Sequence, residues 1–267
     1  MLPVAEAPVN VGDLVYAQPI AVRGPEECVF YHALDLPSIG AVEGHWDLRW
    51  RFDEYVGYTD LRDKTVLDVG TASGFLSFEA ERRGATVVSV DADSAERWNR
   101  LPFRQSLMQR DHAAWLSMAD TYLSRIKKSY WLARREFGSS SRVYYGDANN
   151  LPAELGIFDV VVVGQILVHL RDVILALSSV AARCKGTLII AEGMIDEDRP
   201  YSQFLGRASN PDYDYGFWHH STGLYRELMA ILGFRLSGRR VARYRCNVLD
   251  APNGVEITTL VFDRMET

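Results

Sequence analysis

The sequence predicts an α/β fold in which one mostly parallel, doubly wound sheet carries helices on both faces. From residue 65 onward, short apolar runs alternate with segments of helical periodicity, as in parallel strands joined by crossover helices. The chain has 267 residues, 48% of them hydrophobic, which is enough for one sizeable core. Its last segments form two strand-like runs joined by a turn signal, which predicts an antiparallel end to the sheet.

Five parallel strands are expected from apolar runs that end near a glycine or an acid. They are TVLDVG (65–70), TVVSVD (86–91), RVYYGD (142–147), FDVVVVG (158–164) and TLIIAE (187–192). Helices are expected after Ser73, from near Ser94, over 172–184, and over 221–232 up to Gly233.

Two further stretches complete the expected architecture. RLSGRRVARYRC (235–246) and GVEITTLVFDRM (254–265) are predicted strands joined by the turn signal DAPNG. The interval 92–141 is long for one crossover, and HAAWLSMADTYLSRIKK (112–128) is typical of an inserted helix. The insertion, placed around 98–128, either forms a lid or covers an edge of the sheet.

Composition excludes several classes of protein. A net charge of −6 and a pI near 5.6 disfavour nucleic-acid binding, although RIKKSYWLARREF (125–137) mixes basic and aromatic residues locally. Three cysteines without a CxxC pair argue against a disulfide framework and a thiolate zinc site. No apolar run approaches the roughly 18 residues of a membrane span, and no signal peptide is recognisable, so a cytoplasmic protein is expected.

The stretch VLDVGTASGF (66–75) predicts a ligand site at the end of the first parallel strand. Gly70 and Gly74 let the backbone approach a ligand, and the following helix N-terminus favours a carboxylate or phosphate. The G-x-x-x-G spacing differs from the G-x-G-x-x-G of dinucleotide sites, which makes a nicotinamide cofactor less favoured. Asp68 would repel a phosphate but can hold an ammonium group, so the cofactor is expected to carry a cation.

Acids at the next two strand ends extend this site. Asp91 follows the glycine turn by about 20 residues, where a carboxylate can accept both hydroxyls of an adenosine ribose. Asp147 can accept from an adenine amino group, and the Ala148 N–H can reach a ring nitrogen.

These motifs, in this order, resemble those of the class I S-adenosylmethionine-dependent methyltransferases over roughly residues 60–265. The resemblance implies a Rossmann-like seven-stranded methyltransferase sheet with an antiparallel last strand, and S-adenosyl-L-methionine as cofactor. It divides the chain into an N-terminal extension or cover (1–60) and a cofactor-binding domain (61–267). One departure is Ala72 in place of the family's middle glycine, a change that is tolerated if φ at Ala72 is negative.

A closer resemblance is to the branch that contains the tRNA wobble-uridine carboxymethyltransferase and many natural-product methyltransferases. It is carried by FYHALDLPSIGAVEGHWDLRWRFDEYVGYTDLRDKTVLDVG (30–70) and GQILVHLRDVILALSSVAARCKGTLIIAEG (164–193). It implies that the segment before the first parallel strand covers the cofactor, with Tyr31, His32 and Trp46 in the cover and Arg49 paired with the cofactor carboxylate. Ordinary packing of an N-terminal extension is the alternative.

The cofactor-binding residues expected on all these grounds are Arg49, Asp68, Gly70, Thr71, Ala72, Ser73, Gly74, Asp91, Ala92, Asp147, Ala148, Gly164 and Gln165.

Methyl transfer to a hydroxyl or protonated amine needs a route for the proton, so a base is expected on the loops after the fourth and fifth strands. His169 is the first choice, with a structural turn histidine as the alternative, and Glu192 is the second. His219 and His220 are the third; adjacent histidines diverge too far to chelate one metal, and no metal is predicted.

Aromatic residues before the last helix are expected either to wall an acceptor pocket or to anchor that helix. They are Tyr213, Tyr215, Phe217 and Trp218, of which the last three are assigned to the pocket.

The leading function is O- or N-methylation of a secondary metabolite, which is the small-molecule acceptor. The chain is a possible homodimer. A tRNA-modifying carboxymethyltransferase and a non-catalytic binding protein with the same fold are the alternatives, and a nicotinamide-dependent oxidoreductase is more distant. The sequence does not identify the acceptor.

Overall fold

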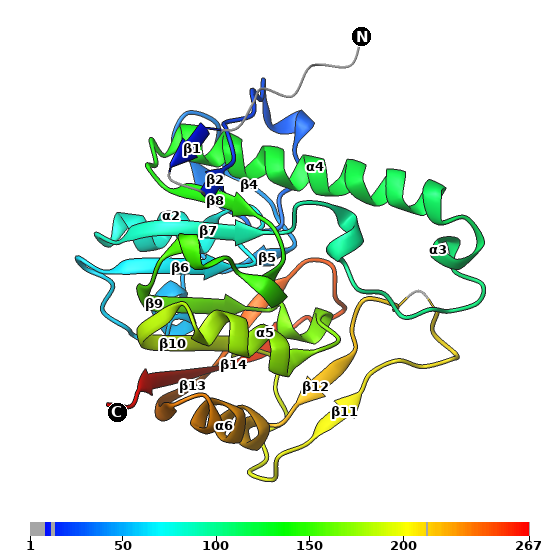
Figure 1. Ribbon diagram of the computed structural model, residues 1–267. Coiled ribbons are helices and arrows are strands. Elements are labelled where there is room, and N and C mark those ends of the chain that lie inside the picture. Colours follow the sequence, from blue (N-terminus) through cyan, green and yellow to red (C-terminus); the bar gives the residue numbers. More distant parts are fainter. Residues whose placement is uncertain (1–8, 12–13, 212, 267) are drawn as a thin grey trace.

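The computed structural model describes residues 9–11, 14–211 and 213–266, so parts of the predicted N-terminal extension (1–8 and 12–13) lie outside the described residues. An eight-stranded sheet forms the middle layer, in the order β5-β13-β14-β10-β9-β6-β7-β8 (Figure 1). The neighbours from β10 to β8 are all parallel. The predicted doubly wound α/β class is confirmed.

The five parallel strands lie where the apolar runs predicted them. They are β6 (Thr65–Val69), β7 (Thr86–Asp91), β8 (Arg142–Tyr145), β9 (Phe158–Gly164) and β10 (Cys184–Glu192). Their valines and isoleucines are buried on both faces of the sheet, as is typical of central parallel strands.

The C-terminal strands give the predicted antiparallel ending. β14 (Val255–Arg264) pairs antiparallel with both β10 and β13 (Phe234–Cys246), so it lies between them. The two-residue β5 (Trp46–Asp47) adds an eighth strand beyond the seven expected, by pairing with the end of β13. It attaches the N-terminal segment to the sheet.

Helices cover both faces of the sheet. On one face, α1 (Phe52–Tyr55), α2 (Phe75–Arg82) and α4 (His112–Glu136) pack over β6, β7, β8 and β9. On the other, α5 (Val173–Ala181) and α6 (Thr222–Ile231) pack over β9, β10 and β14. Ser221 caps α6, because its side chain accepts from the Leu224 N–H.

Two sequence predictions need correction. The helix expected from Ser94 is only a 3-10 turn (Ala95–Arg97), and the chain then runs without regular structure to α3 (Leu107–Arg110). The inserted helix is longer than predicted and continues to Glu136, because the apolar spacing persists through Leu123, Ile126 and Tyr130. α4 extends beyond the end of the sheet (Figure 1).

The helix predicted over 172–184 ends at Ala181, because Cys184 already belongs to β10 and pairs with Phe158. The remaining strands form three small ribbons: β1 (Val9–Val11) with β2 (Leu14–Tyr16), β3 (Leu34–Leu36) with β4 (Gly40–Val42), and β11 (Ser202–Phe204) with β12 (Trp218–His220). In the part of the chain that the structure describes, no helix has the length and apolar character needed to cross a bilayer.

Candidate functional site

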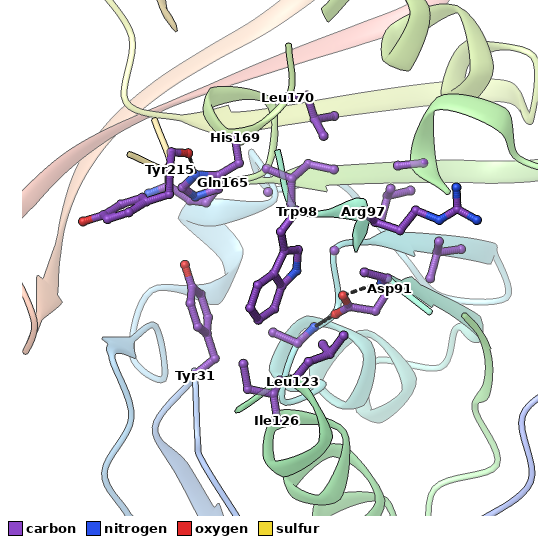
Figure 2. Close-up of a pocket in the computed structure, with 18 of the residues that line it drawn as sticks. Tyr31, Asp91, Arg97, Trp98, Leu123, Ile126, Gln165, His169, Leu170 and Tyr215 are labelled. Atoms are coloured by element: carbon purple, nitrogen blue, oxygen red, sulfur yellow. Dashed lines mark hydrogen bonds between the residues drawn. The ribbon is translucent and has the colours of Figure 1, made fainter. Parts of the chain in front are cut away.

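A cavity of about 490 Å³ lies at the carboxyl ends of the parallel strands, the position at which doubly wound sheets bind ligands. Its floor contains the last residues of three strands and the turns that follow them. Its cover comes from the N-terminal segment, from the chain between β7 and α4, and from the loop before β12 (Figure 2).

The glycine turn after β6 brings backbone to the cavity wall. Gly70 and Gly74 have φ of +88° and +84°, in the left-handed region that glycine tolerates. A Cβ at Gly70 would lie 2.2 Å from Ile166 Cγ2, so a side chain there would collide with the neighbouring turn. Only Gly70 and Ala72 of this turn line the cavity.

Ala72 does not meet the condition of a negative φ, since its φ is +46°. The Ala72 N–H donates to Asp91 Oδ2 at 2.6 Å, and this bond holds the residue in the left-handed region. The departure from glycine is therefore accommodated by the acid on the next strand.

Asp91 ends β7 and lies on the cavity wall, as predicted (Figure 2). Its other oxygen accepts from the Ala92 N–H at 2.7 Å, and burial raises the pKa of this carboxyl. Two backbone donors fix the carboxylate, and its remaining lone pairs can accept from the hydroxyls of a ligand.

Asp68 is placed inside the protein, away from the cavity wall. Its Oδ2 accepts from Ser77 Oγ at 2.7 Å in a buried hydroxyl chain that also contains Ser89 and Tyr130. Burial raises its pKa to about 6, and Oδ1 has no partner among the described residues. The carboxylate thus supports the glycine turn from behind, which corrects the prediction that it faces a cationic group.

The cavity wall does not include Thr71, Ser73 or Gly74, although these residues were predicted to contact the cofactor. Ser73 Oγ accepts from the Tyr31 N–H at 2.7 Å and lies 2.9 Å from Ser129 Oγ. Ser73 therefore joins the glycine turn to the N-terminal cover and to α4.

Arg49 is also placed elsewhere than predicted. Its guanidinium binds Asp47 and Asp35 at 2.6 Å each, and it is not among the residues that line the cavity. These ion pairs raise the pKa of Arg49 and lower that of Asp47. Both partners belong to the same N-terminal segment as Arg49. They pair with the guanidinium that the prediction assigned to a cofactor carboxylate.

The third strand end supplies Asp147 and Ala148, and both line the cavity as predicted. Asp147 Oδ1 accepts from the Asn149 N–H at 2.9 Å, and Oδ2 lies 3.6 Å from Arg97. Ala92, Gly164 and Gln165 also lie on the wall, as expected.

His169 lies on the cavity wall beside Tyr215 (Figure 2). Its Nδ1 is 2.7 Å from the Tyr215 carbonyl oxygen, which can only accept, so Nδ1 carries the proton and Nε2 a lone pair. Burial lowers the pKa of the imidazole, which favours the neutral form. This bond to the backbone is the kind that the structural alternative predicts, and it also leaves Nε2 able to accept a proton.

Glu192, the second predicted base, is buried away from the cavity. Its oxygens accept from the Val168 N–H at 2.6 Å and from Tyr225 Oη at 2.9 Å, and burial raises its pKa to about 7. Glu192 therefore joins the end of β10 to the turn that carries His169. It is a positioning residue in this structure.

The histidine pair is not in the cavity either. His220 Nδ1 lies 2.8 Å from Ser202 Oγ across the β11 and β12 ribbon, and burial lowers its pKa to about 4. His219 does not line the cavity. The described residues contain no group of three or more histidine, cysteine, aspartate or glutamate side chains placed to hold a metal ion.

The structure divides the residues predicted for the acceptor pocket into two groups. Tyr31, His32, Trp46 and Tyr215 line the cavity. Phe217 is buried and does not line the cavity, and Trp218 packs on Phe204 while its Nε1 donates to the Arg171 carbonyl at 3.2 Å. Phe217 and Trp218 therefore fit the alternative prediction, that these aromatic residues anchor the last helix, α6.

Several lining residues were not predicted. The polar and aromatic ones are His45, Tyr55, Arg97, Trp98, Asn99, Arg100 and Tyr122. His45 and Tyr55 lie in the N-terminal segment that carries the closer resemblance, but they were not singled out there. The other five lie in the interval 92–141, whose unusual length is the only signal that the sequence gives for them.

No protein-family model and no curated protein sequence matches the chain. Among solved structures, the magnesium protoporphyrin IX methyltransferase of Synechocystis PCC 6803 with bound S-adenosylhomocysteine aligns with a TM-score of 0.50 at 15% identity, over 80% of this chain and 82% of that one. The chain has the class I methyltransferase fold.

Two further structures share this fold. The 1,6-didemethyltoxoflavin N1-methyltransferase of Burkholderia thailandensis aligns with a TM-score of 0.51 at 14% identity, over 81% of this chain and 78% of that one. A Pyrococcus horikoshii protein, provisionally named as an RNA methyltransferase, gives a TM-score of 0.50 at 12% identity, over 80% and 84% of the two chains. The class I methyltransferase fold thus accounts for the sheet order and the place of the cavity, while the chemistry has to be argued from the cavity itself.

Proposed function

We propose that the protein is an S-adenosylmethionine-dependent methyltransferase that methylates an oxygen or nitrogen of a small-molecule acceptor. The observation that carries the proposal is one cavity in which Asp91, the Gly70 to Ala72 backbone and Asp147 with Ala148 meet at three strand ends. The solved structures of two fold relatives hold S-adenosylhomocysteine in proteins named as small-molecule methyltransferases. The residues present fit such a cofactor, with Asp91 for the ribose and the Asp147 turn for the adenine.

The cavity itself supplies a route for the acceptor proton. S-adenosylmethionine, when bound, supplies an electrophilic methyl group on a positive sulfonium and leaves as a neutral thioether. His169 Nε2, unprotonated because Nδ1–H faces the Tyr215 carbonyl, takes the proton that the acceptor oxygen or nitrogen loses. Glu192 positions this turn through the Val168 N–H. The cover formed by Tyr31, Trp46 and Trp98 excludes water from the reacting atoms.

The acceptor is proposed to be a secondary metabolite in the cytoplasm, in line with the acidic chain. The tRNA alternative depended on the basic segment 125–137, and several of its cations are engaged within the molecule. Arg125 donates to the Cys28 carbonyl, Lys128 pairs with Glu27, and Arg135 donates to the Val22 carbonyl. This use of the basic residues favours the small-molecule acceptor.

Calorimetric titration of the purified chain with S-adenosylmethionine and S-adenosylhomocysteine tests the proposal. We expect micromolar dissociation constants and at least a tenfold loss of affinity in Asp91→Asn, because the amide removes an acceptor for the ribose hydroxyls. Glu96→Gln is the matched control, since Glu96 is exposed on the same segment and does not line the cavity.

If well-folded protein binds neither compound, the methyltransferase proposal fails and a scaffold role is favoured. Preference for a carboxylated analogue of S-adenosylmethionine would point instead to carboxymethyl transfer.

A further inference from the structure

Part of the cavity wall is an arc of aromatic and imidazole rings contributed by three segments outside the sheet. Tyr31 and His45 come from the N-terminal segment, Trp98 and Tyr122 from the chain between β7 and β8, and Tyr215 from the loop before β12. Consecutive rings are neighbours: the centroids are 5.3 Å apart for Tyr31 and His45, 6.5 Å for His45 and Tyr122, and 6.2 Å for Tyr122 and Trp98.

Arg100 closes the arc between two of these rings. Its guanidinium carbon lies 5.8 Å from the Trp98 ring centroid and 5.7 Å from that of Tyr215. The arc then continues to His169, whose ring centroid is 5.8 Å from that of Tyr215. Figure 2 shows Trp98 pointing into the cavity, with His169 and Tyr215 on the wall that the Tyr31 hydroxyl faces.

The charges on this wall are one-sided. Asp91 and Asp147 are the only carboxylates among the lining residues, and both lie at the strand ends assigned to the cofactor. Arg100 lines the cavity, whereas its partner Asp214, 2.8 Å away, does not. Arg100 Nε is buried and has no hydrogen-bond partner among the described residues. The side of the cavity formed by the arc therefore presents flat π faces, a cation and a base.

From this arrangement we propose that the acceptor is a planar aromatic compound whose methylated atom is a phenolic or enolic oxygen; this rests on the proposed function. Flat rings of the acceptor stack on Trp98 and Tyr215, and offset or edge-to-face aromatic pairs stabilise binding beyond the burial of their area. The acceptor O–H gives its proton to His169 Nε2, and the oxygen's electron pair forms the new C–O bond as the C–S bond of the sulfonium breaks.

The same charges disfavour a protonated amine. A phenolate is attracted by the sulfonium and by Arg100, whose Nε has no hydrogen-bond partner among the described residues. An ammonium group would meet the same positive groups without a carboxylate on the arc, because Asp214, which pairs with Arg100, does not line the cavity. The inference therefore decides between the oxygen and nitrogen acceptors that the proposed function leaves open.

The test measures binding to the protein saturated with S-adenosylhomocysteine, so that acceptor recognition is separated from catalysis. The probes are 2-naphthol, 7-hydroxy-4-methylcoumarin and 1,2-dihydroxyanthraquinone, with tryptamine as a flat cationic counterpart. At least one phenol is expected to bind at least tenfold more tightly than tryptamine. The absorption spectrum of the bound hydroxycoumarin should show its phenolate at lower pH than in free solution.

Substitution of Arg100 gives the residue-level control. Arg100→Gln is expected to weaken phenol binding at least fivefold and to abolish the spectral shift, while affinity for S-adenosylhomocysteine changes less than twofold. Arg104→Gln is the matched variant, because Arg104 is an exposed arginine on the same segment and does not line the cavity. Phenol binding should be unchanged in it.

The outcomes separate the two proposals. Failure to bind S-adenosylhomocysteine rejects the proposed function itself. Normal binding of that compound together with no binding of any of the three phenols, or with equal affinity for tryptamine, overturns the inference on the acceptor alone. An unchanged phenol affinity in Arg100→Gln overturns it as well.

Discussion

At the scale of single residues, Glu192 makes the stability of the protein depend on pH. Its folded-state pKa is raised to about 7 from an ordinary value of 4.5. Between those values the folded chain holds a proton that the unfolded chain has lost, so this contribution is complete below pH 4.5 and is lost as the pH rises through 7. Relative to Glu192→Gln, which cannot ionise, wild type should lose about 3 kcal/mol of unfolding free energy from pH 4.5 to 8.

Urea denaturation of both proteins at a series of pH values measures this difference. Glu154→Gln, on the surface of a short 3-10 helix, shows what the loss of an exposed carboxylate does. A constant difference between wild type and Glu192→Gln across the range would show that Glu192 remains ionised in the folded protein.

The sequence predicted the cavity wall in part, both at strand ends and in the cover, where Tyr31, His32 and Trp46 line the cavity. Asp91 and Asp147 were placed correctly because the end of a parallel strand fixes where the next side chain lies. Glu192 also ends a strand, but its environment depends on Tyr225, 33 positions away, which no local pattern reveals. Arg49 was misplaced because Asp35 and Asp47 neutralise it in the folded state.

At the scale of elements, α4 holds the N-terminal cover in place. Arg125 Nη2 donates to the Cys28 carbonyl at 3.0 Å, and the Arg125 carbonyl accepts from the Val29 N–H at 3.0 Å. We expect Arg125→Ala to loosen residues 22–33 and to weaken binding of S-adenosylhomocysteine about three- to tenfold, because one charged hydrogen bond contributes about 1.5–3 kcal/mol and backbone pairing remains.

Limited trypsin digestion and calorimetry measure the two effects together. Arg23 is exposed, so loosening should appear as faster cleavage after it in the variant. Arg110→Ala, on the exposed face of α3, is the control and should match wild type in both assays. Faster cleavage with unchanged affinity would separate the cover from the cofactor site.

The long insertion shows why element boundaries were harder to predict than element order. Helical periodicity in 112–136 is continuous, so no break in the pattern marks the predicted end at residue 128, and the helix runs on to Glu136. The expected helix at Ser94 failed because Trp98 points into the cavity and Arg100 lines it, instead of packing on a helix face. Residues selected for a ligand weaken the pattern by which helices are recognised.

At the scale of the whole molecule, the alternation of strands and helices was sufficient to predict the sheet and the antiparallel β14, because handedness and short connections restrict the topology. The aromatic arc could not be predicted in the same way. Its members lie between residues 31 and 215 in separate segments, and they meet only when the covers fold over the strand ends.

This assembly predicts coupled protection of segments that are distant in sequence. Two hydrogen bonds connect the segments around the cavity. The Leu101 N–H donates to the Asp214 carbonyl at 2.7 Å, and the Tyr31 N–H donates to Ser73 Oγ at 2.7 Å. A cofactor between these covers stabilises all of them at once, so S-adenosylhomocysteine should slow hydrogen exchange at least tenfold in 28–33, 95–101 and 213–217 together.

Exchange in α6, which does not line the cavity, serves as the internal reference. Protection confined to residues 69–74 would mean that the covers act independently, and Asp91→Asn should remove the protection from all three segments at a fixed ligand concentration.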